Sequence, residues 1–192
     1  MDLVLGGTAL VVAAPVMAAG VAAATWSTRQ WGIFAQERVG RNGVPFQVYK
    51  VRSMCAVAGV ESTITVGADP RITPTGRWLR RLKIDELPQL LNVVRGDMSL
   101  VGPRPDVVGW ADRLEGRDRV VLTVRPGITG PASVAFRHEE DLLDSVDNPE
   151  AYNREVIWPK KVGLNRHYVE TWTLRRDFYW LATTVRSLLD RN

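Results

Sequence analysis

The longest apolar stretch of the chain covers residues 3–25, which carry no charged side chain. A helix of this length is long enough to cross a bilayer. Pro15 lies near its middle, where a proline removes a backbone hydrogen bond and bends a helix. Only Met1 and Asp2 precede the stretch, so it lacks the basic residues that begin a cleaved signal peptide. We therefore expect residues 1–27 to remain as a membrane helix, either spanning the bilayer or bent back within one leaflet.

A strand pattern follows in residues 32–54, with the dipeptide Asn42-Gly43 at its centre. Asn-Gly between two apolar runs is the strongest short signal for a β-hairpin. Lys50 and Arg52 are then on one face of the second strand, because side chains repeat every two residues. These two residues are candidates for phosphate binding, although exposed lysines also protect sheet edges.

Helical spacing returns after the adjacent acids Asp85 and Glu86. Leucines and a valine recur every three or four residues from Leu87, Pro88 suits a first helical turn, and Gly96 suits a helix end. The two acids are then at a helix N-terminus, where free N–H groups and the helix dipole favour anions. An acid followed by proline also starts ordinary helices, so the local pattern alone leaves a purely structural cap open.

The remaining segments carry weaker patterns. We expect a loop over the site in residues 55–75, a helix in residues 106–119 and a close backbone approach to a ligand in the glycine-rich residues 125–130. Five acids in residues 139–147 suggest a solvated helix face more than a second metal site. The apolar stripe in residues 178–189 predicts an amphipathic helix, which lies on a membrane or packs against the core.

Composition narrows the class of protein. The chain has 192 residues, of which 45% are hydrophobic and 24% charged, so it can form one folded domain with an appendage. Its net charge of +4 suits nucleic acid, an anionic membrane or phosphorylated substrates. No RNA-binding or recognition-helix motif is visible, which argues against nucleic acid. The lone Cys55 cannot form an internal disulfide, and His138 and His167 have no metal-ligand spacing.

Candidate chemistry is concentrated in residues 77–105. This run combines Arg77, Arg80 and Arg104 with the acid pair and a Gly-Pro-Arg-Pro turn. Arginine forks suit phosphate oxygens, and carboxylates are ligands for Mg²⁺. Trp26 and Trp31, just after the apolar stretch, are interfacial anchors or ordinary core aromatics.

The run closely resembles the signature of the bacterial polyprenyl-phosphate sugar-1-phosphate transferases, the monotopic phosphoglycosyl transferases. The resemblance covers about residues 3–128. Two features depart from it: Ala14-Pro15 replaces a Ser-Pro break, and residues 131–138 replace a motif that contains Asn-Gly-Arg.

The resemblance implies an α+β fold, in which a re-entrant membrane helix (residues 1–27) precedes a cytoplasmic catalytic domain (residues 28–192). A small sheet is surrounded by helices, some of them amphipathic and interfacial. The chain is expected at the cytoplasmic face of the inner (plasma) membrane, in contact with membrane lipids. A homodimer is left open.

The implied reaction transfers sugar-1-phosphate from a nucleotide sugar, usually a UDP-sugar, to a polyprenyl phosphate such as undecaprenyl phosphate. Asp85 matches the nucleophile, Glu86 the Mg²⁺ ligand, and Arg80 and Arg104 phosphate-binding arginines. Such a reaction initiates exopolysaccharide or other glycoconjugate synthesis. The alternative is a non-catalytic membrane scaffold or a decayed relative.

Overall fold

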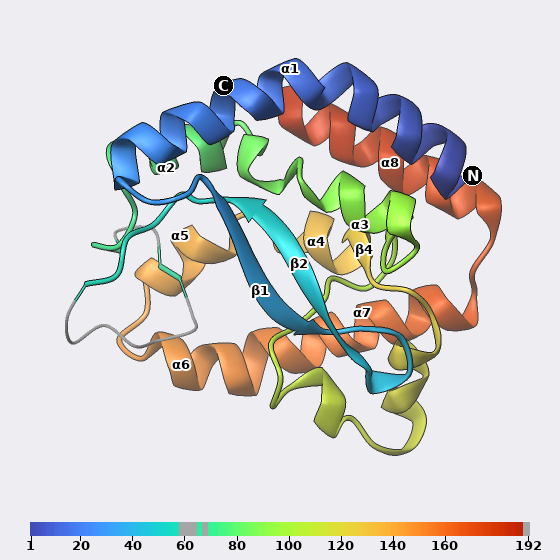
Figure 1. The fold of residues 1–192 in the computed structure, drawn as a ribbon. Helices are drawn as coiled ribbons and strands as arrows, with labels where there is room; N and C mark the ends of the chain where they lie inside the picture. Colours follow the sequence, from blue (N-terminus) through green and yellow to red (C-terminus); the bar gives the residue numbers. More distant parts are fainter. Residues whose placement is uncertain (58–64, 67–68, 190–192) are drawn as a thin grey trace.

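The computed structural model describes residues 1–57, 65–66 and 69–189, and Figure 1 shows their arrangement. Two small two-stranded sheets are surrounded by helices, which confirms the predicted α+β fold. Part of the loop predicted in residues 55–75 falls outside the described residues, so its position over the site stays a prediction.

Helix α1 (Asp2–Thr28) is continuous through Pro15 and lies along the body of the protein. Gly6 faces Val93 of α3, and Gly20 faces Ile84, so the two glycines allow close packing near both ends of α1. Within the described residues, α1 is the one helix long and apolar enough to cross a membrane. Large apolar side chains on its outer face are exposed: Leu3, Val4, Leu5, Val11, Val12, Val16 and Trp26.

Strands β1 (Ile33–Val39) and β2 (Pro45–Val51) form the predicted antiparallel hairpin. The short turn η1 (Arg41–Gly43) joins them, and Asn42 and Gly43 adopt positive φ angles of 59° and 80°. These are the residue types that tolerate the left-handed region, so the Asn-Gly prediction is confirmed. Val48 and Val51 of β2 are buried in two different core clusters.

Helix α2 (Pro74–Arg81) begins at Thr73, whose hydroxyl accepts a 2.9 Å hydrogen bond from the Gly76 N–H. The turn η2 (Ile84–Glu86) and helix α3 (Gln89–Arg95) follow. Gly96 ends α3 in the left-handed conformation at φ 86°, as predicted.

Strands β3 (Ser99–Val101) and β4 (Gly127–Thr129) form a short parallel sheet. A Cβ added to Gly127 would lie 2.1 Å from the backbone nitrogen of Gly102. The glycine therefore allows two backbones to touch. The close approach of Gly127 is to the chain itself, and an approach of residues 125–130 to a ligand stays a prediction.

The prediction of an α-helix in residues 106–119 is wrong. That region contains the short turn η3 (Ala111–Arg113) and the start of the 3-10 segment η4 (Gly116–Thr123). Gly109 and Gly116 have φ angles of 100° and 54°, and each interrupts right-handed helical winding. The chain continues through the remaining helical segments before α8: α4 (Pro131–Ala135), α5 (Glu139–Asp144), α6 (Pro149–Tyr152), a π-helical turn η5 (Asn153–Ile157) and α7 (Trp158–Glu170).

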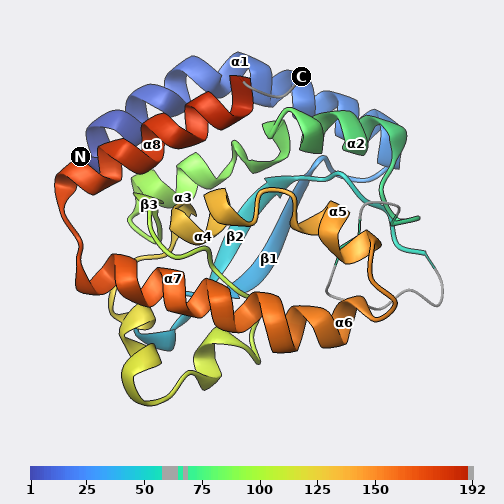
Figure 2. The ribbon, with the colours of Figure 1, turned by 180° about the vertical axis from the view of Figure 1, so that it is seen from behind.

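Helix α8 (Leu174–Leu189) lies beside α1 in both views of the molecule (Figures 1 and 2). Its Trp180 and Leu181 pack against the core, whereas Phe178 and Tyr179 are exposed. The core-facing alternative is therefore confirmed for one face of α8, and contact of its exposed apolar side with a membrane stays a prediction. Trp26 and Trp31 are 89% and 70% exposed, so the core-aromatic interpretation of these tryptophans is wrong.

Candidate active site

The acid pair is presented by a sharp turn between α2 and α3. Lys83 adopts the left-handed conformation at φ 56°, which is uncommon for a residue with a Cβ. It redirects the chain from α2 into η2, where Asp85 and Glu86 form part of a single 3-10 turn. The pair thus lies just before α3 in sequence, close to the predicted helix start but on a turn of its own.

Asp85 is a buried carboxylate, 6% exposed, and its Oδ1 has no hydrogen-bond partner among the described residues. Burial and the negative charge of Glu86 raise the pKa of Asp85 to about 6. The positive charges of Lys83, Lys50 and Arg80 act in the opposite direction. A buried acceptor without a partner is costly in a folded protein, so this oxygen is a position where a ligand can bind or react.

Glu86 has the opposite environment. Both of its oxygens accept hydrogen bonds from Arg104, Oε1 at 2.7 Å and Oε2 at 3.1 Å, and the Lys83 ammonium is 3.7 Å from Oε1. Burial alone would raise the pKa of Glu86, but the charges of Arg104 and Lys83 hold it well below its usual range. Glu86 is therefore a stably ionised carboxylate next to Asp85, whose buried Oδ1 has no hydrogen-bond partner among the described residues.

Further cations surround the pair. Burial and the charge of Arg104 lower the pKa of Lys50 to about 8, which places this lysine in the same electrostatic cluster. Burial and Arg104 also lower the pKa of Arg38 on β1 to about 10. Asp106 belongs to the same cluster, and burial raises its pKa to about 6 against the charges of Lys161 and Arg38. Such a crowd of cations is suited to a polyanion.

The other predicted phosphate ligands lie in different positions. Arg80 is partly buried on α2, and its charge acts on Asp85. Arg77 is exposed on the same helix, three residues earlier. Arg52 lies beyond the end of β2, where its guanidinium donates to the Trp31 carbonyl at 2.9 Å and stacks over the Phe34 ring. The structure thus brings Lys50, Arg80 and Arg104 to the acid pair and engages Arg52 elsewhere.

The second tandem acid pair, on α5, takes part in the same region. Glu140 forms an ion pair with Arg80, and Glu139 accepts a 2.5 Å hydrogen bond from Lys161 of α7. The interpretation of this cluster as a solvated face is therefore wrong for the partly buried Glu139, whereas the side chain of Glu140 is solvent-exposed and also paired. No group of three or more His, Cys, Asp and Glu side chains that could hold a metal is found in the described part of the chain.

A magnesium ion fits the Asp85-Glu86 pair by donor chemistry. Mg²⁺ is commonly held by one or two carboxylates, with substrate phosphates and waters completing its shell. Asp85 Oδ1 is an unpartnered buried oxygen, and each Glu86 oxygen keeps acceptor capacity beyond its bond to Arg104. The two side chains can thus serve as a metal site that phosphates complete.

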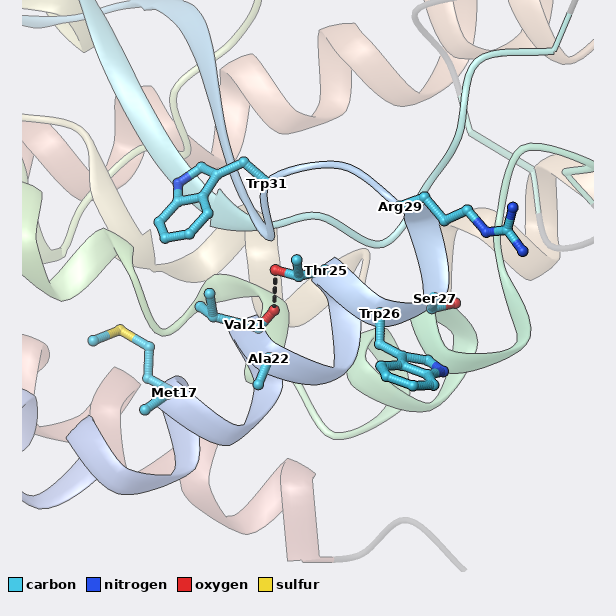
Figure 3. A pocket seen from close by; sticks show the side chains of 9 residues that line it. Met17, Val21, Ala22, Thr25, Trp26, Ser27, Arg29 and Trp31 are labelled. Atoms are coloured by element: carbon cyan, nitrogen blue, oxygen red, sulfur yellow. Dashed lines mark hydrogen bonds between the residues drawn. The ribbon is translucent and has the colours of Figure 1, made fainter.

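A large open cavity of about 1120 Å³ lies elsewhere, along the C-terminal half of α1 (Figure 3). Met17, Val21 and Trp26 are among its lining residues, with Trp31 on the segment after α1. In the same view the Thr25 hydroxyl donates to the Val21 carbonyl at 2.8 Å. This cavity belongs to the apolar side of the protein and is not lined by the acid pair.

Four residues near the site were missed from the sequence: Arg38, Asp106, Glu140 and Lys161. Asp106 directly follows the Gly-Pro-Arg-Pro turn, which was a usable signal. Arg38 is one basic residue among several on a hairpin. Glu140 and Lys161 reach the site only because α5 and α7 fold back onto it, and no sequence spacing reveals that.

The chain belongs to the bacterial sugar transferase family, whose model matches residues 1–191. It is therefore a transferase. A UDP-glucose:undecaprenyl-phosphate glucose-1-phosphate transferase from Caulobacter vibrioides is 35% identical over 98% of this chain and 68% of the relative. An undecaprenyl-phosphate galactose phosphotransferase from Salmonella typhimurium is 34% identical over 100% of this chain and 40% of the relative. The Escherichia coli glucose-1-phosphate transferase is 34% identical over 96% and 38%. The chain thus spans about two thirds of the first relative and two fifths of the other two.

Proposed function

We propose that this protein transfers sugar-1-phosphate from a UDP-sugar to undecaprenyl phosphate, with Asp85 as the covalent nucleophile. The buried Asp85 Oδ1 without a hydrogen-bond partner carries the proposal. An oxygen kept free of donors retains its lone pairs for attack, whereas each oxygen of the adjacent Glu86 accepts a hydrogen bond from Arg104. The relatives that act on undecaprenyl phosphate support the same donor and acceptor classes.

The first step forms an acyl phosphate. An Asp85 oxygen attacks the phosphorus that bears the sugar, and the bond from this phosphorus to the bridging oxygen breaks, releasing UMP. In the second step a phosphate oxygen of undecaprenyl phosphate attacks the same phosphorus and breaks its bond to Asp85. The product is undecaprenyl diphosphate sugar, and the free carboxylate is restored. Two successive displacements let one small site serve a soluble and a lipid substrate in turn.

The chain's cations hold the substrate phosphates in this proposal. Arg104 and Arg80 offer planar forks that match phosphate oxygens, and Lys50 adds a point charge. Their charge also favours the ionised form of Asp85 at the moment of attack. When bound at Glu86 and Asp85, Mg²⁺ supplies further neutralisation of the diphosphate charge.

We also propose a monotopic placement at the cytoplasmic face of the membrane. Gly6 and Gly20 let the inner face of α1 pack closely on the rest of the protein near both ends of the helix. The outer face of α1 exposes apolar side chains. The neighbouring α8 adds Phe178, Tyr179 and Val185, α2 adds Trp78, and Leu82 follows directly after α2. A helix held lengthwise on the catalytic body is suited to lie within one leaflet, with the body at the interface.

The test is direct detection of the intermediate. Purified full-length chain is incubated with Mg²⁺ and UDP-glucose or UDP-galactose, without lipid phosphate. Intact-mass and peptide analysis should then show one added hexose phosphate on the peptide that contains Asp85. Undecaprenyl phosphate should discharge it. Obligatory ternary-complex kinetics, with no adduct from either donor, would contradict the covalent assignment.

A further inference from the structure

Three of the cations around the site are already paired with carboxylates. Arg104 is bonded to Glu86, Arg80 to Glu140, and Lys161 to Glu139. Two of these three carboxylates come from α5, which lies outside the run of residues that carries the chemistry. A phosphate that binds Arg80 must share its guanidinium with Glu140 or displace that carboxylate.

The two α5 pairs differ in how easily they can open. Glu139 and Lys161 are 25% and 21% exposed, so their contact is protected from water. Glu140 is 47% exposed, whereas its partner Arg80 is 21% exposed. Water and incoming ligands therefore reach the Glu140 carboxylate readily, and exposed ion pairs of this kind contribute little net free energy.

Helix α5 does not depend on the Glu140 contact for its position. Leu143 is 2% exposed and anchors the helix in the protein, and the Glu139–Lys161 pair ties it to α7. Opening the Glu140–Arg80 pair should thus leave the helix in place. Arg80 is also close enough to the acid pair for its charge to act on Asp85.

We infer that Glu140 is a specificity-setting competitor for the donor diphosphate: it occupies Arg80 in the free enzyme and is displaced by a substrate phosphate. This inference rests on the proposed function, because it takes Arg80 as a phosphate ligand. Glu140 acts through Arg80 and is a positioning residue. A ligand must bind the Arg80 guanidinium more strongly than the Glu140 carboxylate does. Weakly charged ligands therefore bind less well than a diphosphate.

The experiment measures UDP binding to the full-length chain in detergent micelles by calorimetry, in the presence of Mg²⁺. UDP carries the diphosphate without requiring knowledge of the sugar. Glu140→Gln should tighten the Kd by about two- to fivefold, the range expected for removing an exposed ion pair. Asp144→Asn removes the same charge from the exposed end of α5 and should leave the Kd unchanged.

A double-mutant cycle separates competition from a general change in charge. In an Arg80→Gln background, Glu140→Gln should have no further effect on the UDP Kd, because the competed group is gone. An equal tightening with and without Arg80 would overturn the inference. Glu140→Asp keeps the charge but withdraws the carboxylate by one methylene, so it should give an intermediate Kd even if the glutamine variant folds poorly.

The outcomes also distinguish this inference from the proposed function. UDP binding to the wild type that Glu140→Gln leaves unchanged overturns the inference alone. Failure of UDP to bind any variant overturns the proposed donor class and the inference with it. With an active donor, the change should appear in KM and leave kcat within about twofold, since a purely structural defect would lower kcat as well.

Discussion

Two tandem acid pairs lie at the same site and have opposite environments. On η2, Glu86 is bound by Arg104 while Asp85 keeps an unpartnered buried oxygen. On α5, Glu139 and Glu140 are each bound to a cation from another helix. Both sites contain adjacent acids, although Asp141 extends the run on α5, and composition does not reveal the environment of each carboxylate.

The difference lies in what surrounds each carboxylate. The η2 turn buries Asp85 and leaves its Oδ1 without a hydrogen-bond donor among the described residues. Burial and the charge of Glu86 raise the pKa of Asp85 to about 6. The short helix α5 leaves Glu140 near solvent, where Arg80 reaches it. A buried carboxylate without a hydrogen-bond partner destabilises the fold, so its presence at Asp85 points to a functional role. Glu140 is paired with Arg80 near solvent and neutralises the charge of that arginine.

The largest expected effect comes from removing the reactive carboxylate. Asp85→Asn should lower turnover by more than about a thousandfold, because an amide cannot form the acyl phosphate. The fold should persist, since the substitution removes a buried charge and keeps the shape. UMP release and thermal unfolding measure the two effects. Turnover within tenfold of wild type would transfer the nucleophile's role to another group.

Breaking the bidentate pair should have the next largest effect. Glu86→Gln should lower activity on the order of a hundredfold and raise the Mg²⁺ concentration needed for half-maximal rate. It also leaves Arg104 without its ionic partner, at a cost of about 1 to 3 kcal/mol in unfolding free energy. Metal titrations of UMP release and urea denaturation provide the measurements. EDTA-resistant activity in the wild type would remove Mg²⁺ from the mechanism.

A third carboxylate tests the link between burial and pH. The pKa of Asp106 is raised to about 6 in the folded protein, from an ordinary value of 3.8. The folded state therefore holds this proton more tightly, and its contribution to stability is lost as pH rises from about 4 to 6. An asparagine does not titrate, so the Asp106→Asn variant does not lose this stability. Its free energy of unfolding, relative to that of the wild type, should increase by about 1 to 2 kcal/mol between pH 4 and pH 7.5.

Thermal unfolding at both pH values checks this sign, with the exposed Asp144→Asn as the control. A relative gain at pH 4 that disappears at pH 7.5 would mean that the cations around Asp106 outweigh its burial.

The smallest effect is expected at the partly buried pair on α5. Glu139→Gln should lower the free energy of unfolding by about 0.5 to 1 kcal/mol and change turnover less than about threefold. Faster amide hydrogen exchange in α5 would show that the Lys161 contact holds the helix. A loss of turnover comparable to that of Asp85→Asn would erase the contrast between the two acid pairs.

Local signals predicted the first half of the protein well. Asn42-Gly43 specified the hairpin because few residues accept its backbone angles, and Gly96 ended α3 for the same reason. The position of Asp85 and Glu86 before α3 also followed from Pro88 and the leucine spacing. These features depend on neighbours within a few residues, which a sequence displays directly.

The sequence was less informative in the second half of the protein, for one local reason and for others that depend on distant contacts. In residues 106–119 the glycines at positive φ outweighed the helical interpretation. The contact of Gly127 with Gly102 was not foreseen, because it requires the pairing of two short strands. The solvated-face interpretation is wrong for Glu139, because Lys161 of the distant helix α7 reaches this carboxylate. The re-entrant topology of residues 1–27 stays a prediction.

The seating of α1 on the body has a consequence for biosynthesis. The Gly6 surface is completed by Val93 and Leu100, which leave the ribosome some ninety residues later, and the same core includes Trp180 of the last helix. During translation α1 is therefore an apolar helix whose protein partners have not yet been made. An apolar helix in this state is more stable in lipid than in water. In the membrane placement proposed above, lipid covers α1 until the rest of the chain is made. Deleting α1 would remove residues that pack against the core, and not only the proposed anchor.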